Sequence, residues 1–80
     1  MTVGQIVCSK AGSDKQTFSV VVGFADEKVK ISNGKRHKLA FPKLKNPKHL
    51  SPTGEILDIT SITTDKALRK ALARFRSNLK

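Results

Sequence analysis

The stretch FSVVVGF, residues 18–24, decides the fold class of this chain. Its apolar residues recur at every second position, so an extended backbone places them on one face: Phe18, Val20, Val22 and Phe24. Valine and phenylalanine are also residues that suit a pleated, half-buried strand. The stretch therefore predicts a strand at the centre of a β-rich domain.

Shorter segments of the same kind surround this strand. A short strand is expected at residues 6–8, followed by a polar turn over residues 10–15. Asp26 and Glu27 form a predicted turn, and residues 28–31 alternate between lysine and an aliphatic residue. A last short strand is expected at residues 55–59. The first forty residues are therefore predicted to form mainly β-strands and turns.

A hairpin is predicted where Asn33 and Gly34 follow residues 28–31. A two-residue turn would place Ile31 opposite Arg36 and mix core and charge on one face. A three-residue loop over residues 32–34, with Gly34 in the left-handed conformation, keeps the apolar residues together and is favoured. In that register Ile31 lies opposite Lys35 and Val29 lies opposite His37, and Leu39 joins the apolar face. On the other face Lys30 lies opposite Arg36 and Lys28 lies opposite Lys38, so these four cations are expected to share one face.

Residues 41–54 contain Pro42, Pro47 and Pro52, which argues against a central strand. We expect an extended loop that wraps the sheet, with three apolar anchors: Phe41, Leu44 and Leu50.

A helix is predicted from Asp65 to Leu79, because this segment has no glycine or proline and has helical periodicity. Thr63 or Thr64 can cap it, and the charge of Asp65 suits its first turn. Its apolar stripe should cover the sheet and consists of Leu68, Leu72, Phe75 and Leu79, with Ala71 beside them.

The charge of the chain limits the kinds of molecule that it is expected to bind. The 80 residues carry a net charge of +10, and residues 28–54 hold eight lysines and arginines without one Asp or Glu. Such a segment repels itself, which selection tolerates most readily where a polyanion binds. Nucleic acid is the leading partner; an anionic membrane ranks well below it, and a solvated basic face kept for solubility is the alternative without a partner.

Other classes of protein are less well supported. No segment has the length of a membrane span, the first residues do not look like a signal peptide, and the single Cys8 fits a cytoplasmic protein. His37, His49 and Cys8 show no catalytic or metal-binding spacing, so neither an enzyme nor a cofactor is expected. Only Phe41 among the phenylalanines is a candidate for exposure, which favours recognition of a nucleic-acid backbone and its shape over reading of bases.

The segment VGQIVCSKAGSDK, residues 3–15, followed by residues 18–23, resembles a KOW motif. Gly12 matches the glycine of the motif loop, whereas Gln16 stands where many such loops have a second glycine. With residues 48–50 and the helix over residues 64–72, the chain is similar to one bacterial group. These are KOW-domain RNA-binding proteins related to the fourteenth large-subunit ribosomal protein of archaea and eukaryotes.

The resemblance implies a single mainly β domain: a small, SH3-like, partly open barrel of about five strands with its wrapping loop over residues 1–62, and a helix over residues 63–80. It implies a monomeric, non-catalytic protein that binds RNA, with ribosomal RNA the expected partner and ribosomal proteins as further neighbours. An alternative is a module that docks on the ribosome or on RNA polymerase, as KOW domains of elongation factors do. Gly12 and Gly34 are the expected structural loop residues, and the expected RNA-binding residues are Lys10, Lys15, Lys28, Lys30, Lys35, Arg36, Lys38, Lys43, Lys45, Lys48 and His49.

Overall fold

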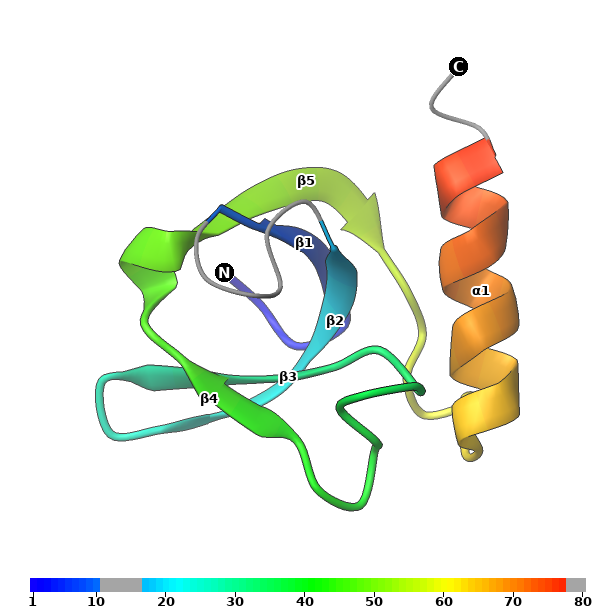
Figure 1. Cartoon of the computed structure of the whole chain (residues 1–80), viewed down its shortest axis with the longest axis horizontal. Coiled ribbons are helices and arrows are strands. Elements are labelled where there is room, and N and C mark those ends of the chain that lie inside the picture. Colours follow the sequence, from blue (N-terminus) through cyan, green and yellow to red (C-terminus); the bar gives the residue numbers. More distant parts are fainter. Residues whose placement is uncertain (11–16, 78–80) are drawn as a thin grey trace.

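The computed structural model describes residues 1–10 and 17–77, which form a five-stranded antiparallel sheet and a C-terminal helix (Figure 1). Along the sheet the strand order is β4-β3-β2-β1-β5, so β4 and β5 are the edges and the described residues do not close the sheet. The expected mainly β domain with a C-terminal helix is confirmed at this level. The elements are β1 (Gln5–Ser9), β2 (Phe18–Ala25), β3 (Lys28–Ser32), β4 (Lys43–Lys45), a 3₁₀ turn η2 (Pro47–His49), β5 (Leu50–Ile56) and α1 (Asp65–Ser77).

Both faces of the curved sheet carry buried apolar side chains. One cluster lies within the curve and contains Val7, Val21, Val29, Ile31 and Leu50. The other cluster lies between the sheet and α1 and contains Ile6, Val20, Leu68 and Leu72. Successive residues of β2 therefore bury their side chains on opposite sides, and α1 supplies the cover that the second face needs.

The face predicted for β2 is correct for its first part and wrong at its end. Phe18, Val20 and Val22 belong to the cluster under α1. Phe24 instead pairs with Val29 and is 51% exposed. The register shifts between Val21 and Gly23, and an extra residue in a strand turns the following side chains to the other face.

The turn at Asp26 and Glu27 is confirmed, because Ala25 pairs with Lys28 across it. The predicted hairpin at Asn33 and Gly34 is wrong. The second neighbour of β3 is β4, with Lys30 opposite Leu44. The cross-strand pairs expected between residues 28–31 and residues 35–39 therefore do not form.

A local hydrogen-bond network explains why residues 35–39 leave the sheet. The Asn33 side-chain oxygen accepts hydrogen bonds from the backbone N–H groups of Lys35 and His37. The N–H groups of Asn33 and Gly34 both donate to the His37 carbonyl. These bonds occupy backbone groups that a strand ladder would need. Gly34 has a φ of +78°, so its predicted left-handed conformation is confirmed.

The loop predicted over residues 41–54 is wrong, because this segment contains β4, η2 and most of β5. Pro47 begins η2, and Pro52 lies in β5, where an edge strand tolerates the missing N–H. Of the three expected anchors, Leu50 is buried, whereas Phe41 is 81% and Leu44 is 51% exposed. The strand expected at residues 55–59 corresponds only to the end of β5, which stops at Ile56.

The helix matches its prediction closely. It begins at Asp65, and its two central stripe residues, Leu68 and Leu72, are buried. Phe75 meets Phe18 edge to face, with ring centroids 5.1 Å apart. Leu79 lies outside the described residues. Within those residues, the structure has no helix that is long and apolar enough to cross a membrane.

Thr64 rather than Thr63 caps α1, since the Thr64 hydroxyl oxygen accepts a hydrogen bond of 3.1 Å from the Ala67 N–H. We expect Thr64→Ala to lower the free energy of unfolding by about 1 kcal/mol, because an N–H of the first turn loses its partner. Thr63→Ala is the matched control and should change the free energy of unfolding by only about a few tenths of a kcal/mol. Denaturant unfolding of both variants measures the difference, and equal losses would contradict the assignment of the cap.

Candidate nucleic-acid interface

Strand β3 places its two lysines on one face of the sheet. Val29 and Ile31 are buried within the curve, so the intervening Lys30 and the preceding Lys28 point to the opposite side. Lys30 lies opposite Leu44 of β4 and beside Gly23 of β2. This half of the predicted basic strip is therefore present.

The other half of the predicted strip is absent from this face. Arg36 and Lys38 belong to the loop between β3 and β4, and neither lies across from a lysine of β3. The predicted four-residue strip is wrong for the reason given above, namely the hydrogen bonds that the Asn33 side chain makes within the loop. Like-charged cross-strand pairs, which destabilise a sheet, are thereby avoided.

Lys43 and Lys45 of β4 lie on the inner side of the sheet. They pair with Ile31 and Val29, and cross-strand partners share a face. Lys45 is only 8% exposed, so its aliphatic stem covers the edge of the apolar cluster. Lys45 consequently presents much less surface to a partner than its neighbours do.

Three further candidates meet at η2. The Asn46 side chain accepts a hydrogen bond from the Lys48 N–H and so caps this turn. The Lys10 N–H donates to the His49 carbonyl at 2.8 Å, which fixes the end of β1 against η2. Lys10, Lys48 and His49 are all exposed at this corner.

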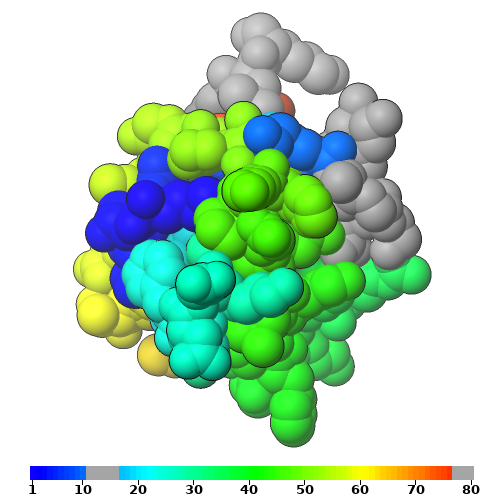
Figure 2. All heavy atoms as spheres, turned by 90° about the vertical axis from the view of Figure 1, so that its left-hand side faces the viewer, coloured from blue at the N-terminus to red at the C-terminus, as the bar shows by residue number. Residues whose placement is uncertain are grey.

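Together these residues follow adjoining elements, with Lys28 and Lys30 on the outer face of β3 and Lys43 and Lys45 on the inner side of β4. Figure 2 shows the segments around β3, β4, η2 and the end of β1 side by side on one side of the molecule. We call the set the basic band and define it as Lys10, Lys28, Lys30, Lys43, Lys45, Lys48 and His49.

A second group of cations lies between α1 and the loop that follows β3. Lys35 and Arg36 of this loop and Arg69 and Arg76 of α1 line one hollow of about 410 Å³. We call it the helix groove. The Arg69 Nη1 donates a hydrogen bond of 2.6 Å to the Gly34 carbonyl, which joins the helix to the loop.

Arg69 and Arg76 are missing from the residues predicted to bind RNA. Their separation of seven residues places them on one side of a helix, and that signal was present in the sequence. No such signal places Lys35 and Arg36 against this side of the helix. Their position depends on the β3–β4 loop, which was wrongly predicted to be a hairpin.

The remaining candidates have simpler outcomes. Lys15 and Gly12 lie outside the described residues, and Lys38 lies on the exposed part of the β3–β4 loop.

In the described part of the chain, no three His, Cys, Asp or Glu side chains are grouped so as to hold a metal ion. No protein-family model matches the chain.

Proposed function

We propose that this protein is a non-catalytic RNA-binding domain of the KOW type, with an SH3-like barrel architecture, and that it acts as a monomer on structured ribosomal RNA. The observation that carries the proposal is the basic band. Five of the eight cations of residues 28–54 lie on adjoining elements in this band, namely Lys28, Lys30, Lys43, Lys45 and Lys48, of which Lys45 is largely buried. Such a surface suits a phosphate backbone, which attracts several lysines at once.

The buried aromatic residues offer no stacking platform for bases. Phe18 and Phe75 pack against each other between the sheet and α1, whereas stacking on single strands needs exposed aromatic rings, which among the described phenylalanines are Phe24 and Phe41. The lysines of the band offer point charges, which bind phosphates without reading sequence. RNA affinity should therefore depend strongly on salt and weakly on base sequence.

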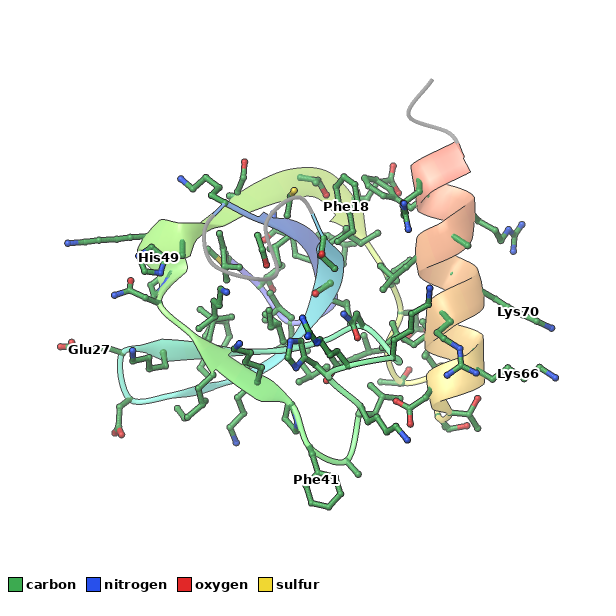
Figure 3. The ribbon with its side chains drawn as sticks, in the orientation of Figure 1. Phe18, Glu27, Phe41, His49, Lys66 and Lys70 are labelled. Carbon is green, nitrogen blue, oxygen red and sulfur yellow. The ribbon has the colours of Figure 1, made fainter. Side chains whose placement is uncertain are left out.

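A second candidate function rests on two exposed apolar side chains. Phe41 projects from the β3–β4 loop, away from the rest of the molecule, and Leu44 follows it in β4 (Figure 3). Exposed apolar anchors are typical of protein interfaces, so this region suits docking on the ribosome or on RNA polymerase. Sedimentation of tagged protein in cell extract, with and without ribonuclease, separates the two: survival of the complex after digestion favours a protein partner.

The RNA-binding proposal predicts the behaviour of the double variant Lys28→Gln/Lys30→Gln. Both lysines lie on one face of β3, so the double substitution should leave up to two phosphates without a cation. We expect affinity for a duplex RNA to fall by roughly one to two orders of magnitude at about 0.1 M salt. The slope of log affinity against log salt should fall by about one unit for each phosphate that is no longer neutralised.

Lys66→Gln/Lys70→Gln is the matched control, because these side chains project from α1 on its far side from the sheet (Figure 3). The control removes the same charge and should change affinity much less. Affinities are measured at several salt concentrations, alongside melting temperatures that verify folding. Equal losses and equal slopes in the two variants would contradict a site on β3 and leave a diffuse charge effect.

A further inference from the structure

The helix groove combines cations from two parts of the chain around an apolar floor. Lys35 and Arg36 come from the loop after β3, and Arg69 and Arg76 come from one side of α1. Phe18 and Leu72 contribute to the lining between them. None of the described residues that line this hollow is acidic.

Several hydrogen bonds hold the two walls of the groove together. Arg69 donates to the Gly34 carbonyl at 2.6 Å, and the Leu39 N–H donates to the Asp65 carboxylate at 2.8 Å. The Asn33 side chain fixes the backbone of the loop at Lys35. A ligand therefore meets a site that is already shaped, and less ordering has to accompany binding.

The charges of the groove favour an anion. Four cations around one hollow repel one another, and the low-dielectric walls of a cleft focus their field. The carboxylate of Asp65, one turn before Arg69, is engaged by the Leu39 N–H. Guanidinium groups present paired N–H donors that match the oxygens of a phosphate, which makes arginine a preferred residue at phosphate sites.

We propose that the helix groove is a second phosphate-binding site, which holds a stretch of RNA backbone while the basic band holds another. This inference rests on the proposed RNA-binding function. A hollow of about 410 Å³ is larger than a lone anion needs and falls among sites that take whole small molecules. The groove therefore suits a nucleotide within a chain, with its phosphates at the arginines and its sugar against the apolar floor.

The test uses the full chain, a duplex RNA hairpin and the double variant Lys35→Gln/Arg76→Gln. Neither substituted side chain makes the hydrogen bond that joins loop and helix, which belongs to Arg69. We expect RNA affinity to fall roughly ten-fold or more at about 0.1 M salt, and the salt slope to fall by about two units. The matched control is Lys70→Gln/Arg74→Gln, which removes one lysine and one arginine elsewhere on the exposed surface of α1 and should keep affinity within a few-fold of wild type.

The outcomes separate the groove from the general function. RNA binding by wild type with equal losses in the two variants would overturn the groove and leave the RNA-binding function standing. Failure of wild type to bind RNA at low salt would overturn both. A selective loss in Lys35→Gln/Arg76→Gln, with an unchanged melting temperature, supports the groove.

A measurement on the wild-type protein covers the case in which a variant does not fold. Side-chain NMR signals of Arg69 and Arg76 should shift on addition of the hairpin, whereas that of Arg74 should shift much less. Inorganic phosphate at the same phosphate concentration should shift them only weakly. Equal shifts with inorganic phosphate would overturn the RNA assignment in favour of a small-anion site, and unchanged Arg69 and Arg76 signals with RNA would overturn the groove.

Discussion

Truncation of the chain after Thr64 is expected to abolish cooperative unfolding. The cut removes Leu68 and Leu72, which are buried against Ile6 and Val20 on one face of the sheet. A sheet that loses the cover of one apolar face exposes that face to water, at a cost of about 25 cal/mol for each Å². A domain of this size is only marginally stable, so the remaining sheet should not persist.

The single substitution Leu72→Ala tests the same packing more gently. Leu72 is 4% exposed and packs with Leu68 over β1 and β2. The cavity and the reduced burial should lower the free energy of unfolding by about 2–4 kcal/mol. Lys70→Ala, on the exposed side of the same helix, is the control and should be nearly neutral.

Thermal and denaturant melting followed by circular dichroism measures all three variants. The opposing hypothesis is that α1 is an independent arm that docks on a partner and contributes nothing to the domain alone. Wild-type melting of the truncated chain, or a neutral Leu72→Ala, would support that hypothesis and contradict ours.

The helix and the central strand could be predicted because their signals are local. The stripe of α1 and the alternation of β2 each follow from the spacing of apolar residues within one segment. The bulge after Val21 could not be predicted this way, because nothing in the spacing marks an extra residue. As a result Phe24 lies on a different face from Val20.

Strand pairing was less accessible because it depends on distant segments. The sequence Asn33-Gly34 favours a hairpin, but here the side-chain oxygen of Asn33 bonds to the following loop. Ile31 therefore pairs with Lys43, ten residues beyond Asn33, instead of with a residue just after the turn. The loop predicted over residues 41–54 was wrong for a related reason. Prolines exclude a central strand but permit an edge strand such as β5, and which strand lies at the edge depends on distant segments.

The candidate site was predictable as a list of charges but not as an arrangement. The run of cations after Lys28 predicts a polyanion partner without any structure. Their division into a band and a groove depends on the loop at Asn33, which turns Lys35 and Arg36 towards α1. Lys45 shows the same limit, since only its pairing with Val29 reveals that it is largely buried.

Gly34→Ala should damage both the fold and the helix groove, because Gly34 joins the loop after β3 to α1. Its φ of +78° costs an alanine about 1–3 kcal/mol in backbone strain. An added Cβ would also lie 2.5 Å from the Asp65 carbonyl oxygen and 2.9 Å from the Arg69 side chain. Separations this short cannot persist, so the loop must move away from the helix.

The movement should have a functional consequence beyond the loss of stability. The Gly34 carbonyl accepts the hydrogen bond of Arg69, and the following residues, Lys35 and Arg36, form one wall of the groove. We therefore expect Gly34→Ala to weaken RNA binding even at temperatures at which the variant remains folded. Its melting temperature should fall by about 4–8 °C for each kcal/mol by which stability decreases.

Gly54→Ala provides the matched control for this last prediction. Gly54 lies in the exposed edge strand β5, and a Cβ built there meets no described heavy atom within 4 Å. Alanine should fit at this position and leave stability equal or slightly higher, since it restricts the unfolded chain. Melting temperatures and RNA affinities of the two alanine variants are compared with wild type. If the two variants have the same melting temperature, Gly34 does not hold the loop against α1. If Gly34→Ala has a lower melting temperature yet binds RNA as wild type does, the loop takes no part in binding.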